Sequence, residues 1–197
     1  MELTKTSEKA RFMQEILDRE WEMFQEVKSA TPASCQNSPD TFRQVRGSIF
    51  QLWPHDLMAA YLIELTRARR LGRNLLTEKY ARMDNLIAPI NTNPVIDKIV
   101  EIETRWQEEI RQKYPALYKR SCRGTEQTDD GSNFSVYLKC ELETYGDTAL
   151  GIYYEWVYQA TQLGMNYSLT MLNHIVLKSG YKSLDEAEAF WAEKIKG

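Results

Sequence analysis

Residues 8–28 read EKARFMQEILDREWEMFQEVK, and the apolar side chains in this stretch recur three and four positions apart. This spacing places them on one side of an α-helix, because successive helical residues turn by about 100°. Glu20 lies near the middle of the apolar stripe, whereas Glu22 lies on the opposite side and is expected to face water. The stretch therefore predicts an amphipathic helix that carries one acidic side chain into the core. The stripe consists of Met13, Ile16, Leu17, Phe24 and Val27, with Trp21 at its edge.

The same helical spacing covers almost all of the remaining chain. Segments rich in turn residues, such as TPASCQNSPD at 31–40 and SCRGTEQTDDGS at 121–132, separate the helical stretches. Asp40 is expected to cap the second helix, and a strand stays open over residues 118–123. We therefore expect an all-α fold: a single domain over residues 1–197, built as a bundle of about eight helices with a polar pocket in its core. The helical stretches cover approximately residues 8–28, 40–53, 56–71, 75–87, 95–113, 134–145, 148–163, 167–178 and 184–194.

Three other predicted helices also place a charged side chain inside an apolar stripe. Arg46 lies inside the stripe of the second helix, and Glu103 lies inside that of the fifth. Glu141 lies near the middle of the stripe in the helix over 134–145, whereas Glu143 points away from it. A buried carboxylate needs a cation, a metal, hydrogen bonds or a raised pKa, and Arg46 is the obvious partner for Glu20 or Glu141. The pattern indicates either a structural ion pair that joins three helices or a polar ligand pocket inside the bundle.

Composition and charge exclude several classes of protein. The net charge of −3 argues against a nucleic-acid partner, because a nucleic-acid-binding surface is basic. No apolar run approaches the roughly 20 residues that cross a bilayer, and we expect no secretory signal, so no membrane partner is predicted. Cys35, Cys122 and Cys140 are odd in number and widely spaced, which favours free thiols in a reducing compartment. These features predict a cytoplasmic protein, and they leave its oligomeric state undefined.

The sequence contains no motif that identifies a metal or a cofactor. Di-iron bundles need a His three residues after a Glu, and neither His55 nor His174 follows an acidic residue at that spacing. An all-carboxylate Mg²⁺ or Mn²⁺ site is an open alternative, but we assign no metal ligands. Cys35 lies in a polar loop, and a nucleophilic role would need a base such as His55 beside it. A plain loop cysteine is the simpler interpretation.

The segment TEKYARMDN at 77–85 adds a second group of polar residues. Glu78 and Arg82 are four positions apart on one side of the predicted helix, where such a pair is mildly favourable. Tyr80 belongs to the apolar side of the same helix. If this helix is buried on both sides, the Glu78–Arg82 pair forms a second polar layer in the core.

Several blocks spread over nearly the whole chain share one resemblance. They read EWEMF (20–24), SCQ (34–36), DTFRQVR (40–46), GRNLLTEKYARM (72–83) and YLKCELETYGDT (137–148). With these blocks the chain resembles the bacterial family catalogued as domain of unknown function 4125, a resemblance that implies no named activity. After EKYARM this sequence has Asp84 where the family pattern usually has a second methionine, and its loop between Ile90 and Val95 is short. If that loop shapes a pocket, the substrate preference is expected to differ from that of the family. The blocks fall on Glu20, Arg46, Glu78, Tyr80, Arg82, Glu141 and Tyr145.

These residues lead to three functional hypotheses. In the first, the protein is a small-molecule enzyme in which Glu20 or Glu141, with a pKa raised by burial, acts as general acid or base and Tyr80 positions a proton or a carbonyl. In the second, a non-catalytic helical module uses the same pocket to bind a ligand or a partner protein. In the third, the charges form a closed structural network without a cavity. For the enzyme, the residues expected to bind a polar anionic metabolite are Arg46, Glu78, Arg82 and Tyr145.

Overall fold

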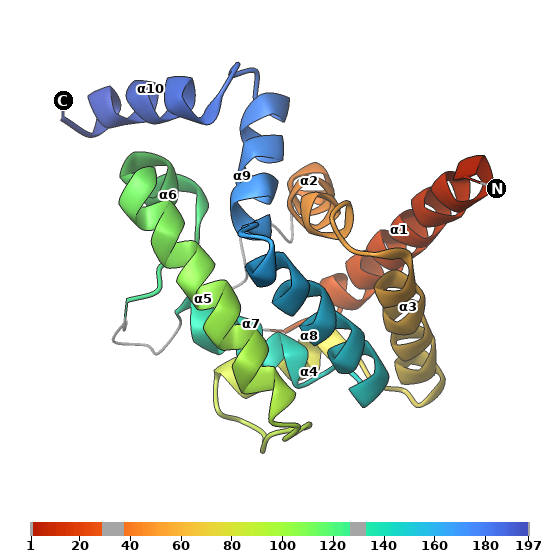
Figure 1. Ribbon diagram of the computed structural model, residues 1–197. Helices are drawn as coiled ribbons and strands as arrows, with labels where there is room; N and C mark the ends of the chain where they lie inside the picture. The colour runs from red at the N-terminus through yellow and green to blue at the C-terminus, as the bar shows by residue number, and fades with distance from the viewer. Residues whose placement is uncertain (1, 29–37, 127–132, 197) are drawn as a thin grey trace.

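The computed structural model describes residues 2–28, 38–126 and 133–196 (Figure 1). Within these residues the chain is all-α, which confirms the predicted fold class, and it forms ten helices rather than about eight. The helices are α1 (Glu2–Gln25), α2 (Pro39–Phe50), α3 (His55–Arg70), α4 (Leu75–Met83), α5 (Val95–Lys113), α6 (Pro115–Ser121), α7 (Phe134–Leu142), α8 (Asp147–Gln162), α9 (Tyr167–Lys178) and α10 (Leu184–Lys196).

Helix α6 has no counterpart among the predicted helices and occupies residues where the sequence left a strand open. Pro115 stands in its first turn, where the missing N–H of proline removes no helical hydrogen bond. The next two N–H groups, of Ala116 and Leu117, each donate to the carboxylate of Glu188 on α10 at 2.9 Å. The first N–H groups of α6 are therefore capped by a side chain more than seventy positions away, a contact that no local sequence pattern predicts.

Three helices begin at an asparagine whose side chain accepts a hydrogen bond from the backbone N–H three residues later, each at 2.9 Å. These caps are Asn74 for α4, Asn133 for α7 and Asn166 for α9. The expected cap at Asp40 is wrong, because α2 already begins at Pro39. Proline has the backbone angle of a first helical residue, so it starts the helix one position before Asp40.

Two hydrophobic clusters fill the interior. The larger cluster includes Phe50, Trp53 and Tyr61, whereas the smaller cluster, which includes Leu117 and Leu172, lies between α6, α9 and α10. Figure 1 shows α10 at one end of the molecule, away from α3 and α4. Both α5 and α9 contribute side chains to the two clusters. The expectation that residues 1–197 form one domain stays a prediction.

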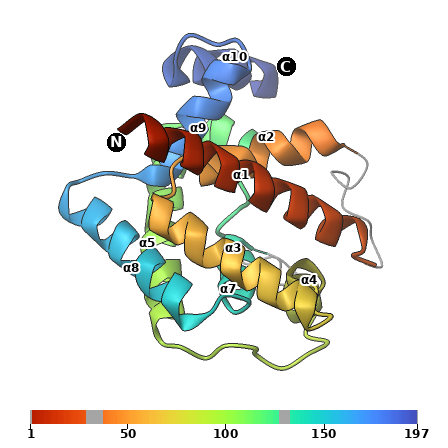
Figure 2. The ribbon, with the colours of Figure 1, turned by 90° about the vertical axis from the view of Figure 1, so that its right-hand side faces the viewer.

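The packing of α1 and α7 positions the candidate site. Helix α1 contacts α2, α3 and α4, and Figure 2 shows α1 and α3 running side by side. Helix α7 packs against α4 and α5, so the side chains of α1, α2, α4 and α7 meet near the middle of the molecule. None of the described helices is long and apolar enough to cross a membrane.

Candidate functional site

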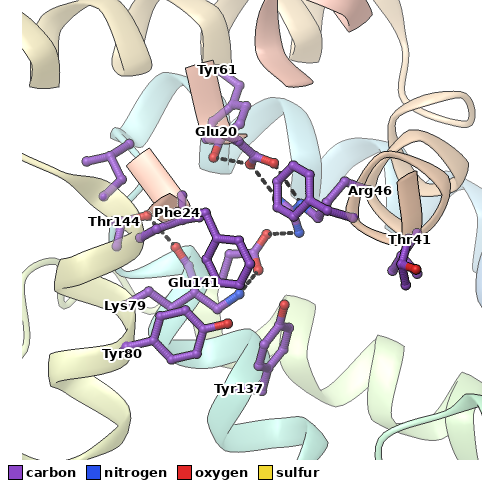
Figure 3. Close-up of a pocket in the computed structure, with 14 residues that line it drawn as sticks. Glu20, Phe24, Thr41, Arg46, Tyr61, Lys79, Tyr80, Tyr137, Glu141 and Thr144 are labelled. Atoms are coloured by element: carbon purple, nitrogen blue, oxygen red, sulfur yellow. Dashed lines mark hydrogen bonds and ion pairs between the residues drawn. The ribbon is translucent and has the colours of Figure 1, made fainter. Parts of the chain in front are cut away.

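Two acidic and two basic side chains from four helices form an ion network (Figure 3). Arg46 on α2 donates from Nε and Nη2 to the two oxygens of Glu20 on α1, at 2.8 and 2.5 Å. Its Nη1 donates to Oε1 of Glu141 on α7 at 2.9 Å. Lys79 on α4 donates to the other oxygen of Glu141 at 2.5 Å. One guanidinium therefore joins both carboxylates, which the sequence offered as alternative partners.

All four charged side chains of the network are buried or nearly so, and two phenols complete their hydrogen bonding. The exposed fraction is 0% for Glu20 and 8% for Glu141. Tyr61 on α3 donates its hydroxyl to Glu20 at 2.7 Å, and Tyr145, just after α7, donates to Glu141 at 3.1 Å. Each carboxylate thus has at least one cation and one phenol. This satisfies the requirement that a buried charge be paired.

The pKa shifts in the network follow from burial opposed by charge pairing. Burial by itself would raise the pKa of Glu141, but the attraction and hydrogen bonds of Arg46 and Lys79 outweigh it and lower that pKa to about 2. Burial disfavours the charges of Arg46 and Lys79, yet the nearby carboxylates raise the pKa of both. Burial and the same carboxylates raise the pKa of Tyr61 and Tyr145. The expectation of a raised pKa at Glu141 is therefore wrong, because two cations contact it.

A cavity of about 120 Å³, here called the first cavity, adjoins the network. An ordered water needs roughly 10–15 Å³ of such space, so the first cavity has room for a small molecule. The ammonium of Lys79 lies 3.5 Å from the centroid of the Tyr137 ring, and Figure 3 shows Tyr80 and Tyr137 near this group. The charged residues of its wall are the four of the network. Its remaining wall consists of Phe24, Thr41, Phe42, Val45, Tyr61, Leu75, Leu76, Tyr80, Tyr137 and Thr144.

A further cavity of about 100 Å³, here called the second cavity, shares Arg46, Tyr137 and Glu141 with the first. Glu103 on α5 lines it and accepts a hydrogen bond from the Tyr153 hydroxyl at 2.5 Å. Burial raises the pKa of Glu103 to about 7, and the hydrogen bond from Tyr153 opposes this rise only in part. The buried Glu141 and the partly buried Glu103 therefore have very different proton affinities.

Glu78 and Arg82 do not pair with each other as predicted. Arg73 donates two hydrogen bonds to the carboxylate of Glu78, both at 2.7 Å. Arg82 donates to Glu143 at 2.6 Å, and Glu143 is only 1% exposed, so pointing away from the apolar stripe of α7 does not bring Glu143 to the surface. Glu143 keeps helical backbone angles and donates its N–H to the Lys139 carbonyl, so it does lie on the other side of α7 from Glu141. That side of α7 packs against α4, which supplies Arg82, and does not face solvent. Neither Glu78 nor Arg82 lines the first or the second cavity.

Of the remaining predicted site residues, Glu20, Arg46, Glu141 and Tyr80 line the first cavity, and Tyr145 lines the second. Glu22 is exposed, as expected, with 60% of its side chain accessible. The roles assigned to these residues stay predictions.

Sequence reasoning missed Lys79 and Tyr61. Lys79 follows Leu75 by four positions and therefore lies on the same buried face of α4. Tyr61 stands midway between Leu57 and Leu65, at four-residue spacing on α3, and all three are buried. In both cases the four-residue spacing from a buried leucine indicated that the side chain is buried. The lysine was overlooked because an isolated lysine on an amphipathic helix normally faces solvent.

Among the described residues, no three His, Cys, Asp or Glu side chains lie where they could share a metal ion. His55 contacts Glu8 and Asp56, each at 3.2 Å, near the N-terminal end of α3. Cys35, considered above as a nucleophile, lies outside the described residues. The two carboxylates of the ion network are paired with Arg46 and Lys79.

Fold and site together define an all-α protein with an ion network buried where four helices meet. The chain belongs to the family described as Protein of unknown function (DUF4125), whose model matches residues 10–189. This match confirms the resemblance noted in the sequence blocks. No curated protein and no solved structure matches the chain.

Proposed function

We propose that the chain binds a small ligand in the first cavity and that Arg46 and Lys79 recognise an anionic oxygen on it. A guanidinium has five N–H donors and an ammonium has three. Within the described residues, Arg46 uses three donors on Glu20 and Glu141, and Lys79 uses one on Glu141. Both cations line the cavity, and their unused donors are the observation that carries the proposal.

The apolar part of the wall supports a ligand with a short hydrophobic body. Phe24 and Phe42 lie at the cavity with their rings stacked and the ring centroids 5.4 Å apart. Leu75 and Leu76 line it as well. Ligand sites of this kind combine mostly apolar walls with a few placed polar groups. A small anionic metabolite with an aliphatic or aromatic body fits both halves of the wall.

The second candidate is the acid–base enzyme predicted from the sequence. Glu20, Glu141 and Tyr80 all line the first cavity, which is the observation in its favour. An efficient general acid or base has a pKa near the working pH, however, and the pKa of Glu141 is about 2. Glu141 is also held by two cations and a phenol. Binding without turnover is therefore the function that the geometry supports best.

A cytoplasmic location belongs to the same proposal. The acidic balance of the chain and the free thiols of Cys122 and Cys140 support it. A small-molecule ligand is the proposed partner, and neither nucleic acid nor a membrane is part of the proposal.

Calorimetric titration with benzoate and with benzyl alcohol tests the binding proposal. These probes share a ring, and only benzoate carries an anionic oxygen. We expect the Kd for benzoate to be at least about tenfold lower, a difference of about 1.4 kcal/mol. Lys79→Met should remove most of this preference. The matched control is Lys139→Met on α7, because Lys139 is 46% exposed and pairs with Asp97 on the surface.

Equal affinity for the two probes, or an unchanged preference in folded Lys79→Met, would contradict the proposal. Circular dichroism of both variants verifies that they fold. Incubation of the protein with a metabolite mixture, followed by NMR over time, separates the two candidates, because consumption of a compound would favour the enzyme over the binding module.

A further inference from the structure

Eight of the eighteen residues that line the second cavity are aromatic. The rings of Trp156 and Tyr167 are stacked with centroids 4.4 Å apart, and Tyr153 meets Trp156 edge to face at 5.6 Å. Trp106 meets Tyr167 edge to face at 5.7 Å, and Trp53 meets Tyr153 in the same way at 5.6 Å. These five rings form a continuous chain of contacts around one side of the cavity. Aromatic faces carry negative electrostatic potential and attract cations.

Two acceptor groups on one face of α5 line the same cavity. Glu103 accepts its hydrogen bond from Tyr153, and within the described residues no lysine or arginine forms an ion pair with it. Gln107 follows four positions later, on the same face of the helix. Its side-chain oxygen is buried and has no hydrogen-bond partner in the described part of the chain. A buried acceptor without a donor is costly, so this oxygen is a place where a ligand N–H would be favourable.

The charges around Glu103 leave its negative charge uncompensated. The shared wall brings Arg46 and Glu141 to the cavity, but these two are bound to each other and Arg46 is also held by Glu20. The other titratable groups that share the cavity with Glu103 are tyrosines: Tyr137 and Tyr145 from α7 and the turn after it, Tyr153 from α8 and Tyr167 from α9. No cation within the described residues is therefore available to balance an ionised Glu103.

We propose that the second cavity is a binding site for a small organic ammonium ion, held by the carboxylate of Glu103, the side-chain oxygen of Gln107 and the surrounding aromatic faces. The three N–H donors of a primary ammonium match the acceptor groups, and the aromatic faces attract its charge and its alkyl part. The indole N–H of Trp53 is buried in the same wall and has no acceptor among the described residues, so it offers a hydrogen bond to a hydroxyl group on the ligand. This site does not depend on the ligand proposed for the first cavity.

Binding of a cation at this site is linked to the ionisation of Glu103. In the free protein the pKa of Glu103 is about 7, so the carboxyl group is about half protonated at pH 7. An ammonium ion favours the carboxylate, and binding therefore releases about half a proton per ligand at that pH. For the same reason the affinity should rise about tenfold between pH 6 and pH 8, as the fraction of ionised Glu103 increases.

Calorimetric titration with propylammonium tests the proposal, with propan-1-ol as the neutral probe of nearly the same size. The titration is repeated in two buffers with different ionisation enthalpies, which measures the released protons. We expect propylammonium to bind at least about tenfold more tightly than propan-1-ol. Glu103→Gln keeps an acceptor for Tyr153 and should weaken propylammonium binding at least about tenfold and abolish the proton release. Glu101→Gln, on the exposed side of α5, is the matched control and should change neither quantity.

Trp156→Leu provides an independent test, because it removes an aromatic face and leaves both acceptors in place. It should weaken propylammonium binding several-fold and leave binding of propan-1-ol almost unchanged. Three results would overturn the proposal: equal affinity for the two probes, full affinity in folded Glu103→Gln, or binding without proton release at pH 7. Loss of benzoate binding in Lys79→Met leaves these titrations unaffected, so the two proposals fail separately.

Discussion

The two cavities share part of their walls, and a buried glutamate in the first contrasts with a partly buried glutamate in the second. Glu141, at the first cavity, contacts two cations and has a pKa of about 2. Glu103, at the second cavity, contacts a phenol and has a pKa of about 7. Burial pushes both values upward, so the difference comes from the cations. Burial alone therefore does not decide the charge of a carboxyl group. The cations in contact with it decide whether it ionises.

Removing Arg46, the cation that joins both carboxylates of the network, should produce the largest loss of stability. Arg46→Met leaves Glu20 without its ion-pair partner and Glu141 with Lys79 alone, which should lower the free energy of unfolding by about 3–5 kcal/mol. Chemical denaturation at pH 7 measures this change. Arg43→Met on the same helix removes a partly exposed pair with Asp18 and should cost less than about 1 kcal/mol. Equal losses in the two variants would show that the buried network contributes no more to stability than the partly exposed Arg43–Asp18 pair.

Acid should destabilise the folded protein through protonation of Glu141. The folded pKa of about 2 lies below the ordinary value of 4.5, so the unfolded chain takes up the proton first as the pH falls. The ionised carboxylate therefore contributes about 3 kcal/mol above pH 4.5, and this contribution is lost progressively between pH 4.5 and 2. Denaturation of the wild type and Glu141→Gln across this range measures it. The free energy of unfolding of the variant should fall less steeply with acid, and parallel curves would contradict the assignment.

A rise in pH from acid to neutral should destabilise the folded protein through Glu103, the opposite of the effect expected at Glu141. The folded pKa of about 7 lies above the ordinary value of 4.5, so stability falls as the pH rises from 4.5 through 7. Glu103→Gln removes this dependence and should be more stable than the wild type by about 3 kcal/mol at pH 8, with almost no difference at pH 4. Thermal or urea unfolding at the two pH values provides the measurement. A variant less stable than the wild type at pH 8 would refute the explanation.

The smallest effect is expected outside both cavities, at Glu78. Its partner is Arg73, whose side chain is 37% exposed, so Glu78→Gln should cost less than about 1 kcal/mol. A double-mutant cycle between Glu78 and Arg82 should give a coupling energy close to zero, because Arg82 binds Glu143 instead. A larger coupling for Glu78 with Arg82 than with Arg73 would restore the pairing suggested by the sequence.

The fold class and three of the charged residues in the wall of the first cavity could be predicted from the sequence, because helical spacing indicates which face of the helix a residue occupies. That geometry is regular inside a helix, and it identified Glu20, Arg46 and Glu141 as inward-facing. It did not show that Glu143, on the other side of α7 from Glu141, is buried as well, because that side packs against α4. It also failed for α6, whose start depends on Glu188 from a distant helix.

The partners of the charges could not be predicted, since pairing depends on how helices pack and not on the sequence of any one helix. Arg82 lies one turn after Glu78, yet its guanidinium contacts Glu143 from α7's C-terminal turn. The sequence predicted that Glu103 faces inward, but only the packing of α5 against α7, α8 and α9 shows that Tyr153 is its hydrogen-bond partner and that none of the described lysines and arginines pairs with it. The pKa of a buried group is a property of those contacts, so it follows from the fold and not from residue type.

The most direct test is an NMR titration of the side-chain carboxyl carbons of Glu103 and Glu141, assigned by comparison with Glu103→Gln and Glu141→Gln. We predict that the Glu103 signal shifts with a midpoint near pH 7, whereas the Glu141 signal stays unchanged down to about pH 3. Midpoints for both groups near the ordinary value of 4.5 would contradict the account, because they would show that the cations around Glu141 and the burial of Glu103 have no effect on proton binding.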